Sequence, residues 1–145
     1  MRYILIIAFI TVSNIAAGQY IDTTSAIYKY LDPKPAPPYD LFNFIGNNIR
    51  YPDEARQNNI QGKVYVRFVV NEDGRLDSIS APRAIKYISH KRGRDYDTLS
   101  VTQLGYGIEE EAIRVVKLLP PFNPGKYNGK PVKVLYTIPL VFKLQ

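Results

Sequence analysis

The residues with the clearest chemical potential are a single histidine, a run of acids and a basic cluster. His90 is the only histidine and the chain has no cysteine, so zinc sites lack their usual ligands. None of the GxSxG, HExxH, P-loop or dinucleotide-binding patterns occurs. A catalytic base at His90 would need a nucleophile or carboxylate partner, which the sequence does not indicate. We expect no catalytic residue, no cofactor and no metal; an enzyme built around His90 is the competing hypothesis.

The acids Glu109, Glu110 and Glu111 are consecutive. On a helix, consecutive side chains point in different directions, so these three cannot converge on one substrate. They suit the positive end of a helix dipole instead. We interpret them as structural.

The basic residues Lys91, Arg92 and Arg94, with Tyr87 and Tyr96 nearby, could meet phosphate. We interpret this cluster as a solvated loop, with an anionic lipid or an acidic protein patch as the functional alternative and no nucleic-acid partner. The net charge of +6 favours anionic partners without identifying one.

The first residues predict export. Arg2 precedes an apolar run over residues 4–12, which is followed by the small residues Ala16, Ala17 and Gly18. This pattern is typical of a secretory signal peptide, here residues 1–18 with cleavage after Gly18. The apolar run is well short of the roughly 20 residues that span a bilayer, so no transmembrane anchor is predicted.

The remaining chain suits one domain, because domains cluster at about 100–150 residues. Residues 19–40 form an N-terminal segment that ends in a short proline-rich spacer, residues 33–38. In the polyproline conformation this spacer would be roughly 19 Å long. The domain itself is expected at residues 41–145.

Helical spacing of apolar residues predicts a helix from Leu41 through Ile49. Pro52 suits the first turn of a second short helix that ends near Asn58 or Asn59. A third helix should begin at Ile108, with one apolar stripe.

Strict alternation predicts a strand at residues 63–70, a turn at residues 71–74 and a returning strand at residues 75–81. A last strand is expected at residues 132–144, after a turn at residues 127–130. Pro139 interrupts this strand, which should therefore lie at an edge or be bulged. Residues 82–107 are expected to form a long insert loop, either functional or partly ordered. The predicted fold is α+β, with two to three helices on one face of a small three-stranded antiparallel sheet and the element order α-β-β-α-β.

Several short motifs recur along the chain in a fixed order. Their residues are Tyr51, Pro52, Ala55, Gly62, Gly74, Glu111, Ala112, Pro121, Pro124, Gly129 and Lys130. In these residues and their order, the sequence over residues 41–144 resembles the C-terminal domain family of TonB, the periplasmic energy transducer.

The resemblance implies a periplasmic binding domain of the cell envelope, associated with TonB-dependent transmembrane transport. It also implies that the edge strand receives an extended segment of an outer-membrane transporter, or of another envelope protein, by β-strand addition. Glu111 would pack or pair within the domain. The residues expected on this edge are Val132, Val134, Leu135, Tyr136, Thr137, Ile138, Leu140 and Phe142.

Two variants and one alternative follow from this hypothesis. Proline at Val134 or Leu140 should weaken binding and spare the fold. The alternative is an assembly module that forms a homodimer through the same edge and has no part in transport.

The sequence departs from the family pattern in three ways. A typical transducer has an uncleaved membrane anchor and a long proline-rich spacer, and neither is visible here. The third departure is the insert at residues 82–107. Without an anchor, the chain is not expected to transmit force by itself.

Overall fold

The computed structural model of the chain describes residues 20–22, 27–89 and 96–145. The predicted signal peptide lies outside these residues, as do His90, Lys91, Arg92 and Arg94. No helix among the described residues combines the length and the apolar character needed to cross a membrane.

Within the described residues the main sheet has five strands rather than the predicted three. Its strands are β1 (Ile21–Asp22), β2 (Gly62–Val70), β3 (Leu76–Ser89), β4 (Tyr96–Val101) and β7 (Val134–Phe142), in the order β1-β7-β2-β3-β4. The predicted strands are its centre, β7-β2-β3, and are antiparallel. β1 pairs with β7 in parallel and β4 pairs with β3 antiparallel. The prediction of an α+β fold is therefore confirmed. The predicted number of strands and order of elements were wrong, because β1, β4, β5 and β6 are additional.

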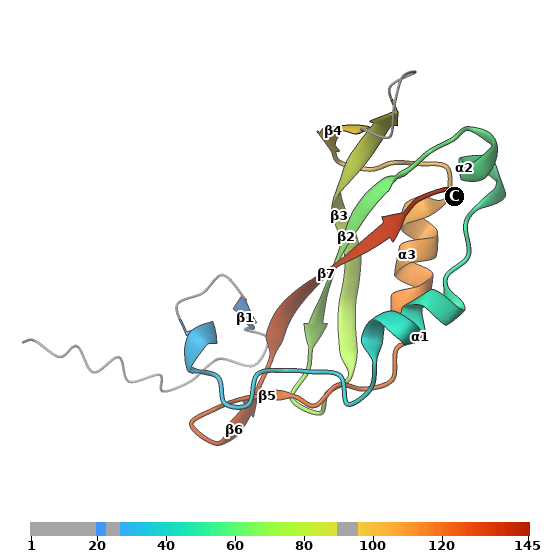
Figure 1. The fold of residues 1–145 in the computed structure, drawn as a ribbon. Coiled ribbons are helices and arrows are strands. Elements are labelled where there is room, and N and C mark those ends of the chain that lie inside the picture. Colours follow the sequence, from blue (N-terminus) through green and yellow to red (C-terminus); the bar gives the residue numbers. More distant parts are fainter. Residues whose placement is uncertain (1–19, 23–26, 90–95) are drawn as a thin grey trace, which may run out of the picture.

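Three α-helices of the described chain lie on one face of this sheet (Figure 1). They are α1 (Leu41–Asn48), α2 (Asp53–Gln57) and α3 (Ile108–Lys117). Asp40 caps α1 by accepting a hydrogen bond from the Asn43 N–H at 3.0 Å. α2 ends as predicted, because Asn59 takes a left-handed φ of 51°.

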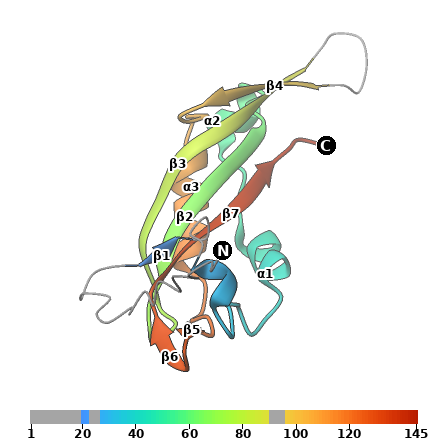
Figure 2. The same cartoon turned by 90° about the vertical axis from the view of Figure 1, so that its left-hand side faces the viewer.

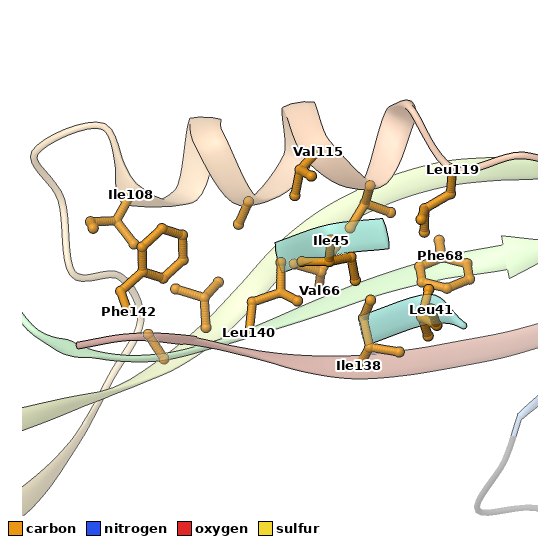
Figure 3. Close-up of a cluster of buried hydrophobic side chains, with 14 of the residues drawn as sticks. Leu41, Ile45, Val66, Phe68, Ile108, Val115, Leu119, Ile138, Leu140 and Phe142 are labelled. Carbon is orange, nitrogen blue, oxygen red and sulfur yellow. The ribbon is translucent and has the colours of Figure 1, made fainter. Parts of the chain in front are cut away.

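The core fills the space between the helices and the sheet (Figure 3). Val64, Val66, Phe68 and Val70 alternate along β2 and are fully buried, which confirms the predicted half-buried strand. Full burial of an apolar side chain of this size contributes about 1.5–3 kcal/mol. The stripe on α3 packs against them and consists of Ile108, Ala112, Val115, Val116 and, just past the helix, Leu119.

Residues 82–107, expected as a loop, instead contain the second half of β3 and all of β4. These strands form a hairpin at the end of the sheet away from β5 (Gly125–Tyr127) and β6 (Lys130–Val132), as Figures 1 and 2 show. Residues 97–100 are all exposed. Because neither face of β4 is buried there, the sequence has no apolar alternation to mark the strand.

The proline-rich segment is tied to the domain and is not a free spacer. The Lys126 N–H donates to the Pro33 carbonyl at 2.9 Å, and Ala36 forms a bridge with Asn123. Nearby, Ile21 and Leu31 are buried against Val132 and Val134 in a small second core.

The turn between β2 and β3 also anchors the segment that follows α3. Gly74 has a φ of +84°, and its carbonyl accepts a hydrogen bond from the Phe122 N–H at 2.8 Å. A Cβ atom on Gly74 would lie 1.9 Å from the Phe122 carbonyl oxygen. Glycine is therefore required both by the left-handed conformation and by the close approach of the two main chains.

We expect Gly74→Ala to lower the free energy of unfolding by roughly 3–5 kcal/mol, because the strained φ adds to the collision with Phe122. Gly129 is a matched control, since its φ is +77° but nothing lies within 4 Å of an added Cβ. Gly129→Ala should cost only about 1–2 kcal/mol. Urea unfolding of both variants checks this, and equal losses would show that the Phe122 contact is unimportant.

Candidate functional site

The open edge of β7 is the candidate site. One side of β7 pairs with β2 along the whole strand, from Gly62 opposite Phe142 to Val70 opposite Val134. The other side pairs with β1 only at Val134 and Leu135. No further strand of the described chain continues along that side. The strand predicted to be an edge is thus covered at its start and open from Tyr136 onward.

The direction of the main-chain groups follows from the contact with β1. The Ile21 N–H donates to the Lys133 carbonyl at 2.7 Å, so the main-chain N–H and C=O groups of Lys133 point away from β2. Because these groups alternate along a strand, Thr137, Pro139 and Val141 also turn theirs to the open side. Thr137 and Val141 offer both an N–H and a carbonyl there, and Pro139 offers a carbonyl alone.

This alternation also explains how β7 accommodates Pro139. The missing N–H faces the open side, so no hydrogen bond to β2 is lost. The register with β2 is unbroken across this residue. Of the two predicted outcomes for Pro139, an edge or a bulge, the structure shows the edge.

Most of the predicted edge residues bury their side chains. Val134, Ile138, Leu140 and Phe142 are at most 3% exposed and belong to the core or, for Val134, to the small second core. They contribute to the site only as part of the strand β7, because their side chains face the core. Among the predicted residues only Thr137 is clearly exposed, while Leu135 is buried and Tyr136 is half-buried.

Val132 is not on the open edge. It belongs to β6 and pairs with Gly125 of β5 in a separate two-stranded sheet. The last strand begins at Val134 instead of Val132, because the chain passes from one sheet to the other at Lys133.

A groove of about 330 Å³ runs between α1 and the open edge. Its lining includes Leu140, on the core side of β7, and Pro139 and Val141, on the outer side, so the groove follows the edge itself. Phe42 of α1 and Val141 are 62% and 54% exposed. The full lining is Phe42, Ile45, Gly46, Ile49, Lys63, Pro139, Leu140 and Val141.

Leu140 is the one lining residue that was predicted as part of the site, and the other seven were not. Phe42 carries a usable signal in the sequence, since it is a large apolar residue outside the apolar stripe of α1. In the structure it remains exposed. Gly46 and Lys63 carry no such signal, because they join the groove only through the packing of α1 beside β7.

A pair of charged residues on α3 holds the end of α1 in place. Glu111 Oε1 accepts a hydrogen bond from the Arg50 N–H at 2.6 Å. Arg114 makes two hydrogen bonds of 2.7 Å to the Glu111 carboxylate and donates to the Asn48 carbonyl at 2.8 Å. We call this arrangement the Glu111–Arg114 clamp. It satisfies main-chain groups that the end of α1 leaves unpaired, and so positions the helix that lines the groove.

The clamp also sets the ionisation of Glu111. The hydrogen bonds from Arg114 are the main reason that the pKa of Glu111 lies below its ordinary value; the Arg50 N–H adds to the effect and burial opposes it. The predicted structural role of Glu111 is therefore consistent with its contacts.

Glu109 has a structural position as well. It is 9% exposed, and its carboxylate accepts hydrogen bonds from the Leu104 N–H at 2.5 Å and the Gly105 N–H at 3.0 Å. These bonds hold the turn that leads into α3. Among the described residues, no group of three His, Cys, Asp or Glu side chains could hold a metal ion.

The other motif residues build the frame around the site. The Tyr51 hydroxyl donates to the Ile60 carbonyl, and its ring meets the Phe142 ring edge-on at 5.8 Å. A Cβ on Gly62 would lie 2.2 Å from the Ile85 carbonyl oxygen. Ala55 and Ala112 are fully buried, and Pro52 occupies the position just before α2 without capping it through its side chain. Pro121 and Pro124 follow α3, and Gly129 and Lys130 belong to the β5–β6 hairpin.

Comparison with protein families finds a match. A family model described as the C-terminal region of the Gram-negative bacterial TonB protein matches residues 47–88 and 85–144. The two matched segments meet in β3, at the start of the β3–β4 hairpin. A search of curated proteins and a search of solved structures each found no match.

The clamp predicts a pH-dependent stability difference. A folded-state pKa below the ordinary value of about 4.5 means that Glu111 stabilises the fold above that pH and loses this contribution as the pH falls through the folded pKa. We expect Glu111→Gln to lower the free energy of unfolding by about 1–2 kcal/mol at pH 7. The difference from the unchanged protein should shrink below pH 4.5. Urea unfolding across this pH range measures both effects.

Glu110→Gln is the matched control, because Glu110 is exposed and lies in the same first turn of α3. It removes the same helix-dipole contribution but none of the contacts to α1. If both variants lose the same stability, or if the loss at Glu111 does not depend on pH, the clamp is not the source of the effect.

Proposed function

This chain belongs to the TonB C-terminal domain family, and on that premise we propose that it is a periplasmic binding domain for an extended segment of an outer-membrane transporter. The family is in general associated with TonB-dependent transport. The segment binds by β-strand addition at the open side of β7, and the domain acts by binding, without catalysis.

The observation that carries this proposal is the unpaired side of β7. From Tyr136 to Phe142 this side is roughly 20 Å long, enough for a short added strand. Main-chain hydrogen bonds supply affinity in such a complex, and alternate side chains supply specificity. Thr137 and Val141 present complete donor and acceptor pairs toward the incoming strand.

The groove beside α1 supports the same mode of binding. Side chains of an added strand alternate between its two faces, and one set would point toward the apolar surface of Phe42, Ile45 and Ile49. The large exposed fraction of Phe42 gives this set a surface to bury.

The homodimer alternative uses the same edge, but nothing in the described residues or in the family match favours it. An enzymatic role for the acids of α3 is also not favoured, because Glu109 and Glu111 are engaged by main-chain N–H groups and by Arg114.

The register between β7 and β2 determines which proline substitutions can test the proposal. Val134 and Leu140 turn their main-chain groups toward β2, where they lie opposite Val70 and Val64. Proline at either position would remove a hydrogen bond inside the sheet, so the register argues against the expectation that these variants spare the fold.

Thr137→Pro is the informative variant. It removes an N–H only from the open side, at a position with the same orientation as Pro139, which the strand already accommodates. We expect the purified protein to capture transporters from an envelope extract and the Thr137→Pro variant to lose at least most of this capture. Mass spectrometry of the captured proteins gives the result.

Thr137→Ala is the matched control, because it shortens the same side chain and keeps the N–H. It should capture transporters as the unchanged protein does. Circular dichroism and thermal unfolding establish that both variants remain folded. Equal capture by the proline and alanine variants, or capture of no transporter at all, would count against strand addition as the function.

A further inference from the structure

One charged residue interrupts the otherwise apolar groove. Lys63 lies on β2, one strand further from the open side than β7, yet it lines the groove together with Pro139 and Val141. It is in register with Val141. None of the lining residues is acidic, and Lys63 makes no ion pair with any described residue.

The outer face of the sheet beside the open part of β7 carries the same sign of charge, whereas the acids Asp22 and Asp77 lie further along, beside Leu135 and Val69. Arg67 lies opposite Thr137 and is exposed, and Arg83 stacks on the ring of Tyr65 at 4.0 Å. Tyr65 itself lies opposite Pro139. The open edge of β7 is thus bordered on its inner side by cations, and Thr137, Pro139 and Val141 contribute no charge to balance them.

A strand that pairs with β7 would displace water from the half-buried Lys63. Removing a cation from water is unfavourable unless an opposite charge replaces the solvent. An acidic side chain opposite Val141 would meet this need, because lysine side chains are long enough to extend across one neighbouring strand.

We propose that the groove selects an extended protein segment with alternating character: apolar side chains facing α1 and an acidic side chain aligned with Val141 on the other face. This inference rests on the proposed strand addition and adds to it the chemical class of the bound segment. The register places the acid beyond Pro139, near the end of β7, where Lys63 is closest in the sheet.

The test uses short synthetic peptides that alternate valine with threonine and carry glutamate, glutamine or lysine at one threonine position. They are titrated to millimolar concentration into the full folded protein. NMR shifts of the Thr137 and Val141 amides report binding at the edge. We expect the glutamate peptide to bind roughly two- to fivefold more tightly than the glutamine peptide, and the lysine peptide to bind least. High salt should reduce this preference.

Charge reversal at Lys63 makes the test specific. Lys63→Glu should invert the order, so that the lysine peptide binds best. Lys117→Glu is the matched control, because Lys117 is exposed on α3 and lies outside the groove. It changes the net charge equally and should leave the preference for glutamate unchanged.

The Thr137→Pro variant separates the two levels of the hypothesis. If all three peptides bind equally and Thr137→Pro abolishes binding, strand addition stands and the acidic preference is overturned. A preference for glutamate that Lys117→Glu removes as effectively as Lys63→Glu would also overturn it, as a net-charge effect. If no peptide binds in a manner sensitive to Thr137→Pro, strand addition itself fails, and this inference fails with it.

Discussion

The pairing of β7 with β2 is the constraint on which the rest of the structure depends. In this register, the even-numbered residues of β7 point their main-chain N–H and C=O groups toward β2. Their side chains point toward the helices. The odd-numbered residues then have the opposite arrangement in both respects. A slip by one residue would expose the core side chains and turn Pro139 toward β2, where its missing N–H would break the ladder. The buried core and the open binding edge therefore specify each other.

The helices keep this arrangement in place through contacts at a few fixed points. The Glu111–Arg114 clamp joins α3 to the end of α1, and Gly74 joins the β2–β3 turn to the segment after α3. Tyr51 joins the start of α2 to the end of β7 through Phe142. Most residues that carry the family resemblance make such contacts between elements. They account for a shared frame, while the groove that they position is lined largely by other residues, such as Phe42 and Lys63.

The elements that bury one face are those that the sequence predicts best. β2 and α3 each bury one face, so their apolar periods of two and 3.6 residues predicted them well. β1 is two residues long and β4 has exposed side chains on both faces, so neither leaves a pattern to find. Val132 was assigned to the wrong strand because it continues the apolar run of β7, and only the pairing shows that the chain changes sheets at Lys133. The edge could be predicted from Pro139, but its open side, its partial cover by β1 and the contribution of Lys63 depend on contacts between distant segments.

The open edge also has to avoid pairing with the wrong partner. Unpaired strands invite aggregation, and proteins limit this risk with proline, short accessible lengths and charged neighbours. All three features occur here: Pro139 removes one donor, β1 covers the start of β7, and Lys63 borders the groove with a charge that no acid of the described residues pairs. Antiparallel pairing of two identical edges centred on Pro139 would set Lys63 of one copy near Arg67 of the other, and these like charges disfavour pairing between copies of the chain. Lys63 also favours an acidic segment, so one residue can discourage self-association and select a partner.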